Sequence, residues 1–368
     1  MVSWYGPQGD QPTGGIFHYE QAQELNKYCN CAIYYPYDRY IDQPVTYGEE
    51  WGVKTYRSKY KLENKLRNRL NMYRAMKRIV KEFKPDIIHG NVATEAGRFA
   101  AILGLLFHIP VVISEHSSAE YSGVDCWPHH FYAWYSYGLS RYNTCVSDHL
   151  TERLSQIFPK YEFHTVYDGI KAPAPASAAV GENYKKEGYI NISVVAGFYD
   201  QWIKGFHLIL PALKRLKCDG EKVMLHVLGG GDWLEHYKNM ATELGIDDII
   251  IFYGNCSKQK VYDIVSQMDY SLSASHVESF GCSLAEAAML GRPMVATRCG
   301  GPESIVDENS GILIAPDSED ELYDAMKRMN RMYTTYDQES ISRRATEKFE
   351  IGRITKQYLD IYNEVLGI

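Results

Sequence analysis

Short apolar runs rich in β-branched residues alternate with longer helical patterns, and this alternation limits the folds that the chain can adopt. In the first half the runs are "DIIHG" (86–90), "IPVVISEH" (109–116), "RYNTCVS" (141–147) and "YEFHTVYDGI" (161–170). A continuously apolar strand is buried on both faces, and helical connections allow successive strands to run parallel. The pattern therefore predicts an α/β fold with a doubly wound parallel sheet.

A second series of the same kind follows after a break. Its runs are "INISVVAG" (190–197), "KVMLHVLGGG" (222–231), "DIIIFYG" (248–254), "MDYSLSAS" (268–275), "RPMVATR" (292–298) and "GILIAP" (311–316). The break at 171–188, "KAPAPASAAVGENYKKEG", has the composition of a linker. We therefore expect an N-terminal domain at 1–170 and a C-terminal domain at 189–345. The sequence leaves open whether the helical pattern at 346–368 packs back on the first domain.

The composition excludes several classes of protein. With 368 residues, 45% apolar and 23% charged, the chain is long enough for about two globular domains. Its net charge of -7 argues against nucleic acid as the main partner. No apolar run reaches the roughly 18 residues of a membrane-spanning helix, and residues 1–10 lack the features of a signal peptide. The eight cysteines are scattered, so we expect reduced thiols in a cytoplasmic protein.

Residues 54–84 differ in charge from the rest of the chain. They hold twelve basic and two acidic residues, a local charge of +10. Apolar residues recur within the stretch at three- and four-residue steps, which predicts an amphipathic basic helix; they are Leu62, Leu66, Leu70, Tyr73 and Met76. Two interpretations remain open. The helix either presents a solvated face or docks on an anionic lipid surface, such as the inner face of the cytoplasmic membrane.

Two glutamates lie on either side of a predicted loop-to-helix junction in "SASHVESFGCSLAEAAMLG" (273–291). Glu278 is in the loop and Glu286 is about one turn into the helix. The unpaired N–H groups at a helix start favour a phosphate or diphosphate, and Gly281 allows the backbone to approach it closely. A carboxylate can accept hydrogen bonds from two neighbouring sugar hydroxyls. The segment therefore predicts a site for a sugar joined to a nucleotide by a diphosphate, although both acids could instead serve only the helix dipole.

An ordered set of further segments accompanies this junction. "SHVESFGCSLAEA" resembles the E-x7-E signature of the family 4 glycosyltransferases, and "PTGGIFHYEQAQEL" resembles the glycine loop and first helix of that family. "VSDHLTERL", "KGFHLILPAL", "LHVLGGGDW" and "GRPMVATRCGGPESIVDENSGILI" follow in family order. The resemblance covers almost the whole chain. It implies the GT-B fold, in which two Rossmann-like domains face each other across a cleft, and a retaining transfer of sugar from a nucleoside diphosphate.

The resemblance also implies roles for individual residues. Glu278 would contact hydroxyls of the donor sugar, and Glu286 would bind the ribose. Backbone amides would hold the sugar and the phosphates; they belong to Phe280, Gly281 and Cys282. The alternative for both glutamates is a purely structural position at the helix N-terminus.

Other matched positions are expected at the same site. Lys204 would pair with the donor diphosphate, and His116 would reach the reacting sugar. Gly14 and Gly15 would approach the donor diphosphate or the acceptor through their backbone, and Gly230 would lie near the donor nucleotide; the alternative is a tight turn for the first two and a strand-end turn for Gly230. The family usually has an arginine after the strand-ending Gly197, where this chain has Phe198, so one expected cation is missing. Glu115, and the "GG-x-x-E" turn of Gly300, Gly301 and Glu303, fit either a structural or a donor-adjacent role. Only Met1 and Val2 precede Ser3, so the first strand is either clipped or begins upstream.

The expected reaction moves a hexose-type sugar to a hydroxyl of a sugar, glycan or lipid-linked acceptor, in polysaccharide or glycoconjugate biosynthesis. No D-x-D metal motif accompanies the site, so we expect neither a metal nor another cofactor. Two alternatives remain. One is a catalytically impaired nucleotide-sugar-binding protein, motivated by Phe198, and the other is a GT-B relative that epimerises or phosphorolyses sugars.

Overall fold

The computed structural model describes residues 1–3, 15–172 and 182–368. These residues form two compact units, one of Met1–Gly169 with Ile351–Ile368 and the other of Ile170–Glu350. Ile170 and Glu350 form a parallel β-bridge, so the chain enters and leaves the second unit at adjacent points. The helical pattern at the C-terminus is consequently divided. Helix α12 (Gln338–Phe349) belongs to the second unit and α13 (Ile351–Leu366) to the first.

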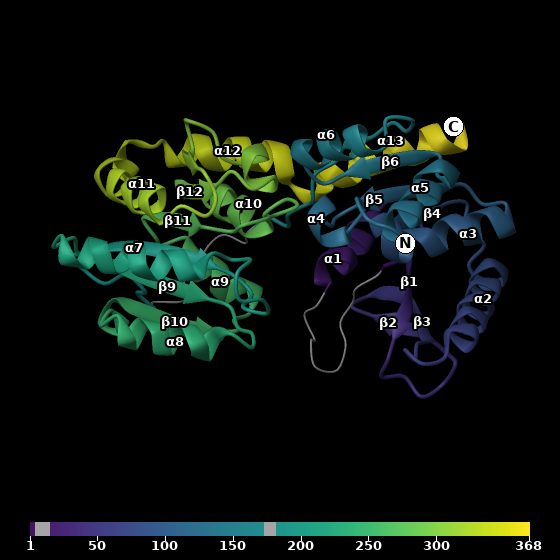
Figure 1. Cartoon of the computed structure of the whole chain (residues 1–368). Coiled ribbons are helices and arrows are strands. Elements are labelled where there is room, and N and C mark those ends of the chain that lie inside the picture. The colour runs from purple at the N-terminus through teal and green to yellow at the C-terminus, as the bar shows by residue number, and fades with distance from the viewer. Residues whose placement is uncertain (4–14, 173–181) are drawn as a thin grey trace. The chain divides into compact units, whose positions relative to one another are not determined.

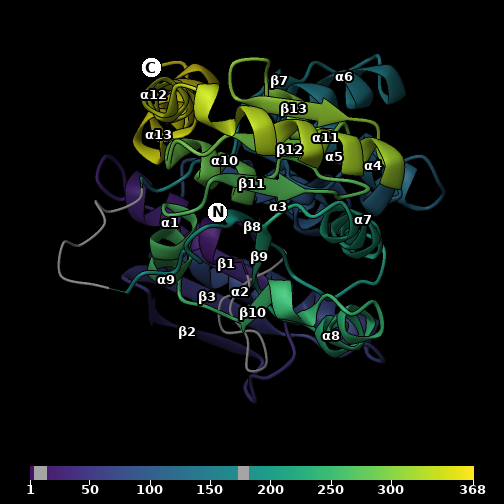
Figure 2. The ribbon, with the colours of Figure 1, turned by 90° about the vertical axis from the view of Figure 1, so that its left-hand side faces the viewer.

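The second unit is built on a six-stranded parallel sheet with the order β10-β9-β8-β11-β12-β13. Figure 2 shows α7, α8 and α11 over one face of this sheet and α9, α10 and α12 over the other. The winding reverses between the neighbouring strands β8 and β11. The bounds are β8 (Ile190–Val195), α7 (Phe206–Cys218), β9 (Val223–Leu228), α8 (Leu234–Glu243), β10 (Ile250–Gly254), α9 (Lys258–Val265), β11 (Tyr270–Ser273), α10 (Cys282–Met289), β12 (Met294–Thr297), β13 (Gly311–Ile314) and α11 (Glu319–Met332).

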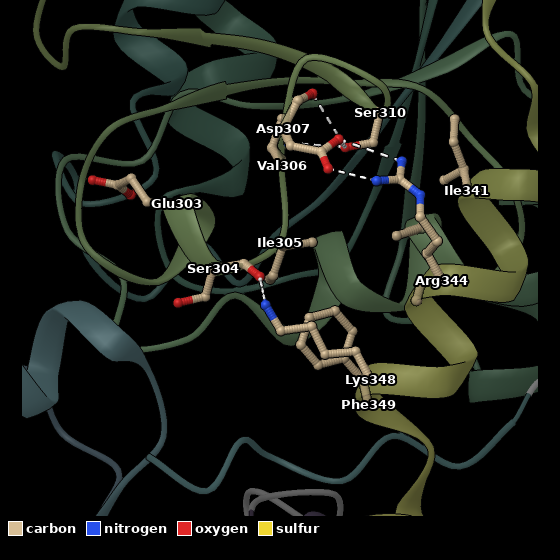
Figure 3. Close-up of a pocket in the computed structure, with 12 residues that line it drawn as sticks. Glu303, Ser304, Ile305, Val306, Asp307, Ser310, Ile341, Arg344, Lys348 and Phe349 are labelled. Atoms are coloured by element: carbon tan, nitrogen blue, oxygen red, sulfur yellow. Dashed lines mark hydrogen bonds and ion pairs between the residues drawn. The ribbon is translucent and has the colours of Figure 1, made fainter. Parts of the chain in front are cut away.

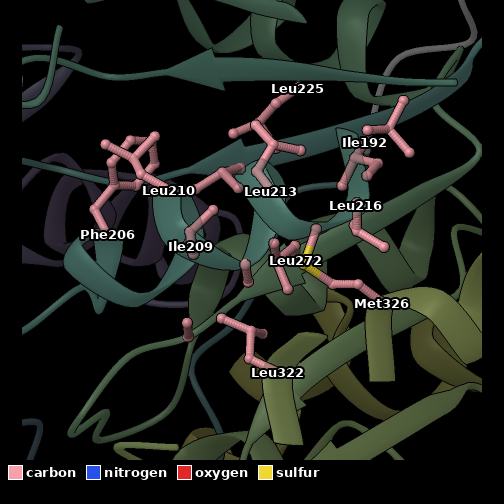
Figure 4. Packing of buried hydrophobic residues seen from close by; sticks show 14 of the residues in the cluster. Ile192, Phe206, Ile209, Leu210, Leu213, Leu216, Leu225, Leu272, Leu322 and Met326 are labelled. Atoms are coloured by element: carbon pink, nitrogen blue, oxygen red, sulfur yellow. The ribbon is translucent and has the colours of Figure 1, made fainter. Parts of the chain in front are cut away.

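The apolar face of α7 fixes the core of this unit. Phe206, Ile209, Leu213 and Leu216 recur at helical spacing and are fully buried against the sheet and α11 (Figure 4). Burying a side chain of this size contributes about 1.5–3 kcal/mol. The helix and the strand ends beside it are thereby held in a fixed register.

The first unit has a sheet that is completed by its first residues. Val2 forms parallel bridges with both Tyr34 and Gly90, and so joins the order β2-β3-β1 to the order β4-β5-β6-β7. All pairings are parallel except β2 with β3. The strands are β1 (Ala32–Asp38), β2 (Val45–Glu50), β3 (Val53–Lys59), β4 (Ile88–Asn91), β5 (Val111–Glu115), β6 (Tyr142–Cys145) and β7 (His164–Thr165).

Helices surround this sheet in Figure 1, and α13 contributes Ile354, Tyr358 and Ile361 to a core cluster with Val112 of β5. The helices are α1 (Ile16–Leu25), α2 (Lys65–Glu82), α3 (Gly97–Phe107), α4 (Ala119–Ser122), α5 (His129–Leu139) and α6 (Asp148–Ile157). A π-helical turn, Val92–Ala96, precedes α3. No helix in the described part of the chain has the length and apolar character needed to cross a bilayer.

The structure corrects one predicted element. The basic stretch at 54–84 is not one helix, because residues up to Lys59 belong to β3 and the helix begins at Lys65. Arg57 of this strand is buried and bonded to Asp38 and Glu50 at 2.6 and 2.5 Å. Part of the local positive charge is therefore neutralised inside the first unit.

Candidate functional site

The loop after β11 carries Glu278 and lies at the point where the sheet of the second unit changes its winding direction. In open parallel sheets the loops at such a point leave a crevice at the carboxyl ends of the strands, where ligands commonly bind. The backbone of Glu278 is fixed from the next loop: its N–H donates to the carbonyl of Cys299 at 3.1 Å, and its own carbonyl accepts from Gly301 at 2.8 Å. The acid is therefore held in place before any ligand arrives.

Lys204 comes to the same point from the loop after β8. Its Nζ lies 2.5 Å from Oε1 of Glu278, and that oxygen also accepts from the hydroxyl of Ser275 at 2.9 Å. The side chains of Lys204 and Glu278 are 28% and 18% exposed, so the pair is accessible to a ligand from solvent. The structure brings together the two residues that the sequence assigned to the diphosphate and the donor sugar.

A glycine locks the two loops together. Gly205 caps α7 with φ of 62°, and a Cβ at this position would lie 1.8 Å from the carbonyl oxygen of Ala274. The neighbouring N–H of His276 donates to the carbonyl of Ile203 at 2.8 Å. Only glycine permits this approach, because it has no Cβ and accepts positive φ. The close contact sets the position of Lys204 relative to Glu278.

Glu286 lies on α10, where partners from α9 surround it. Its Oε1 is 3.4 Å from Nζ of Lys258 and accepts from the hydroxyl of Tyr262 at 3.3 Å. The Glu286 side chain is 17% exposed. Sequence reasoning missed Lys258 and Tyr262, and the only available signal was a lysine in the first turn of a helix, where a basic residue is unfavourable for the dipole.

At the junction into α10, Phe280 and Gly281 are buried and Cys282 is exposed. Phe280 is 1% exposed and packs on Phe349 with ring centroids 5.3 Å apart, so only its backbone can serve a ligand. Gly281, the N-cap residue of α10, has φ of 100° and as a glycine has no side chain to cap the helix. Cys282 is exposed at the first helical position. This arrangement suits an anion held by backbone N–H groups.

The missing arginine has a packing explanation. Phe198 is fully buried and meets Phe206 edge-to-face with centroids 5.0 Å apart. Its N–H donates to the carbonyl of Gly230 at 2.9 Å. A Cβ on Gly230 would meet the Asn255 side chain at 2.8 Å, and one on Gly231 would meet the carbonyl carbon of Phe198 at 2.4 Å. These glycines therefore pack the loop after β9 against the loop after β8, which is a structural role.

The turn after β12 also has a structural role. A Cβ on Gly301 would lie 2.0 Å from the carbonyl oxygen of Phe280, and the Glu303 carboxylate accepts from the N–H of Gly300 at 3.1 Å. Behind this turn is a small pocket of about 160 Å³ (Figure 3). It is closed by an ion pair of Arg344 with Asp307 at 2.5 Å. Ligand pockets typically measure about 300–1,000 Å³, so this pocket is small for a ligand. The residues around it are better explained as support for the loop that carries Glu278.

His116 follows β5 in the first unit, where both of its ring nitrogens face oxygen atoms. Nδ1 is 3.0 Å from Oδ1 of Asp168, and Nε2 is 3.0 Å from Oδ1 of Asn91. The side chain is 5% exposed. Asp168 and Asn91 hold the ring orientation, and sequence reasoning missed both, although Asp168 lies in the quoted segment "YEFHTVYDGI".

Glu115 and His18 pack close to His116. The Glu115 carboxylate is fully buried and accepts from Ala93, Ser117 and Tyr137, and burial raises its pKa. His18 is fully buried with its ring centroid 5.5 Å from that of His116. Burial, and then the neighbouring His116, hold the pKa of His18 well below its ordinary value of 6.5, which keeps the ring neutral at pH 7.

The remaining predicted glycines lie at the start of α1. Gly15 is buried and caps this helix with φ of 66°, as a tight turn requires. Gly14 lies outside the described residues. Within residues 1–3, 15–172 and 182–368, no three His, Cys, Asp or Glu side chains are grouped so that they could hold a metal ion.

Comparison with known families covers most of the chain. The model described as "Glycosyltransferase Family 4" matches residues 19–172, and the one described as "Glycosyl transferases group 1" matches residues 182–347. The chain belongs to the family 4 glycosyltransferases. The predicted family is confirmed.

Individual relatives and solved structures that are similar to this chain are also glycosyltransferases. The D-inositol 3-phosphate glycosyltransferase of Saccharomonospora viridis is 33% identical over 166 residues, which are 43% of this chain and only 37% of that relative. Lipopolysaccharide outer core galactosyltransferase WaaB matches 99% of this chain and 98% of its own with a TM-score of 0.75 and 17% identity. The structure of Anabaena Alr3699/HepE in complex with UDP-glucose matches 99% of this chain and 98% of its own, with a TM-score of 0.76 and 16% identity. These matches confirm the predicted GT-B fold with two Rossmann-like domains.

Proposed function

We propose that this family 4 glycosyltransferase moves a hexose-type sugar from a nucleoside diphosphate to an acceptor hydroxyl, with retention of the anomeric configuration. The observation that carries the proposal is the Lys204–Glu278 pair at the switch point between β8 and β11, beside the start of α10. A carboxylate suited to sugar hydroxyls and a cation suited to a phosphate are held side by side. UDP-glucose, the ligand of the Anabaena structure, is the first donor to test.

Positively charged groups of the second unit would stabilise the diphosphate as it leaves the sugar. When the bond between the sugar and the diphosphate breaks, negative charge develops on the leaving oxygen. Lys204 and the N–H groups at the start of α10 would stabilise this charge, since fixed donors and cations act most strongly where charge develops. Lys258, 3.4 Å from Glu286, would add a second ammonium group to the donor site. With two such groups we propose a reaction that needs no added metal, and turnover that is unchanged by a chelator would support it.

Glu278 and Glu286 are proposed to bind different parts of the donor. Glu278 would exchange part of its bond with Lys204 for bonds to sugar hydroxyls, and Glu286 would bind the ribose. In the first unit Asp168 would orient His116, and Nε2 of His116 would exchange its bond to Asn91 for a bond to a sugar hydroxyl of the substrates. The acceptor would attack on the face from which the diphosphate departs, and an oxygen of the leaving group would take its proton.

Thermal denaturation with nucleotides and nucleotide sugars tests these assignments separately. A ligand present at about 100 times its Kd raises the free energy of unfolding by about 2.7 kcal/mol, which is several degrees in Tm. Glu286→Gln is expected to lose the shift with UDP and with UDP-glucose. Glu278→Gln should keep the UDP shift and lose only the additional shift of the sugar. The exposed Glu243 provides a matched control, Glu243→Gln, which should change neither shift.

Product analysis tests the reaction itself. Nuclear magnetic resonance of the product should show the donor's anomeric configuration, and an inverted product would refute the proposed stereochemistry. Acceptors chosen from the names of the relatives, an inositol phosphate and a lipopolysaccharide core sugar, give a first panel. We place the activity in polysaccharide or glycoconjugate biosynthesis on the same grounds.

The burial of Phe198 favours a second candidate, a nucleotide-sugar-binding protein without transferase activity. Phe198 cannot supply the cation that the family usually has at this position, because its ring lies in the core. A donor-dependent Tm shift with no transfer to any acceptor and no hydrolysis of the donor would favour this candidate. Conversion of the donor sugar in the absence of acceptor would instead indicate an epimerase.

A further inference from the structure

Helix α2 (Lys65–Glu82) has two apolar faces, and only one of them is covered by described residues. The covered face packs on β3 and α3 and contains Asn68, Asn71, Met72, Ala75, Met76 and Ile79. Of the five apolar residues that the sequence pattern grouped together, only Met76 is buried. Leu62, Leu66, Leu70 and Tyr73 are 65%, 80%, 44% and 45% exposed. The structure thus corrects the expectation that the pattern marks a single apolar face.

The exposed residues form a stripe opposite the covered face. At 3.6 residues per turn, Leu66, Leu70 and Tyr73 lie above one another, about half a turn away from Met72 and Ala75. Single exposed leucines need no explanation, but an aligned group of them on an otherwise charged helix is typical of a surface with a partner. We call Leu66, Leu70 and Tyr73 of α2, together with Leu62 in the turn before the helix, the outer stripe.

Basic residues flank the outer stripe. Helix α2 has seven basic residues and one acidic residue, Glu82, which is bonded to Arg78 at 2.8 Å. The six other basic residues of the helix are exposed: Lys65, Arg67, Arg69, Arg74, Lys77 and Lys81. This density of positive charge stands on a chain whose net charge is -7. The partner of the stripe is therefore expected to be anionic.

The apolar surface continues onto a second helix. Tyr73 stacks on Phe107, the last residue of α3, with ring centroids 5.9 Å apart. The two residues before Phe107, Leu105 and Leu106, are 60% and 57% exposed. Figure 1 shows α2 and α3 as neighbours in the first unit. Phe107 thus extends the outer stripe onto the end of α3, and the two together form one apolar strip on two elements.

We propose that this strip docks on an anionic lipid bilayer, with α2 lying in the plane of the interface. Leucines can enter the boundary between headgroups and acyl chains while Lys and Arg on both sides contact lipid phosphates. A solvated helix explains the charge but not the aligned leucines, and a soluble polyanion likewise requires no leucines. The anionic bilayer accounts for both features. This inference is independent of the proposed transferase activity.

Co-sedimentation of the full chain with vesicles tests the proposal. Vesicles of neutral phosphatidylcholine are compared with vesicles containing phosphatidylglycerol, each at low and at high salt. We expect binding to the anionic vesicles only, and a decrease with salt because screening weakens the attraction. Each basic residue near the surface is expected to change the partition constant by about fivefold.

Two variants separate charge from insertion. Arg69→Ser with Arg74→Ser and Lys77→Ser should lower the partition constant about a hundredfold, and Leu66→Ser with Leu70→Ser about tenfold or more. The control for the charge variant is a triple variant in the second unit, Arg328→Ser with Arg331→Ser and Arg343→Ser. The control for the leucine variant is Leu366→Ser near the C-terminus. Both controls should have little effect on the partition constant. The α2 positions are all exposed, so Tm of the α2 variants should remain that of the parent protein.

A fluorescence measurement tests insertion directly. With Leu66→Trp, anionic vesicles should shift the emission to shorter wavelength relative to the parent protein, because the indole leaves water. Equal binding to neutral and anionic vesicles, or a serine variant of the leucines that binds as the parent does, would overturn the proposal. So would loss of binding in the control variants to the same extent as in the α2 variants.

Discussion

The substitution Gly205→Ala is expected to displace Lys204 from Glu278, because it adds a Cβ atom where the structure has no room for one. Gly205 caps α7 with φ of 62°, and an added Cβ would lie 1.8 Å from the carbonyl oxygen of Ala274. That oxygen belongs to the backbone of the loop that leads to Glu278, so it cannot move aside as a flexible side chain would. The start of α7 must move away from β11, and Lys204 moves with it.

The size of the effect can be worked out because the same helix provides a control. Gly220, just beyond the C-terminus of α7, has φ of 81°, and no atom of the described residues lies within 4 Å of the place that its Cβ would take. Gly220→Ala therefore adds only the cost of positive φ, about 1–2 kcal/mol. Gly205→Ala adds that cost and a steric cost of about 1–3 kcal/mol. We expect about 2 kcal/mol for the control and about 4 kcal/mol for Gly205→Ala.

Thermal unfolding of the two variants measures this difference. At about 2–4 °C for each kcal/mol, Gly205→Ala should lower Tm by roughly 10 °C and Gly220→Ala by roughly half as much. Nucleotide should stabilise Gly220→Ala as it does the parent protein, and Gly205→Ala far less. Equal decreases in Tm, with nucleotide binding retained by both, would refute the view that contact with Ala274 positions Lys204.

Three further predictions concern other parts of the chain. Asp168→Asn removes the negative charge beside Nδ1 of His116 but keeps an oxygen acceptor, so transfer should slow by about tenfold or more while the nucleotide-dependent Tm shift persists; an unchanged rate would count against a role for His116. Burial lowers the pKa of His226 from 6.5 to about 4, so the unfolded chain binds a proton that the folded chain does not, and stability should fall as pH is lowered below about 6.5. His226→Gln should reduce this loss between pH 7 and pH 5 by up to about 2 kcal/mol in urea denaturation, and an unchanged pH dependence would contradict the assignment. Phe198→Ala leaves a cavity against Phe206 and should cost about 3–5 kcal/mol, whereas a loss below about 1 kcal/mol would show that the ring is not tightly packed.

The fold of the second unit could be predicted from the sequence because most of its strands are buried on both faces. The run at 222–231 contains β9 (Val223–Leu228), and the run at 292–298 contains β12 (Met294–Thr297). In the first unit β1, β2 and β3 were missed. Pro36 interrupts β1, and the exposed side of β2 carries polar residues, so neither shows a continuous apolar run. The basic residues of β3 led to its assignment to a helix.

The candidate site could be predicted only where a local motif marks it. Glu278 and Glu286 lie within one segment, so their spacing is visible in the sequence. Lys258 reaches Glu286 from another helix, and Asp168 reaches His116 across 52 residues. Such contacts depend on how strands are ordered in a sheet, which no local pattern specifies. The same limit applies to α2, because periodicity does not distinguish leucines that are covered from leucines that are exposed.

The bridge between Ile170 and Glu350 makes the second unit an insertion within the first. An inserted domain whose ends lie one strand spacing apart can be exchanged for another without changing the path of the host chain. The second unit of such a protein can therefore diverge by recombination as a complete module, while the first unit, which carries α2, keeps its own core and its own surface.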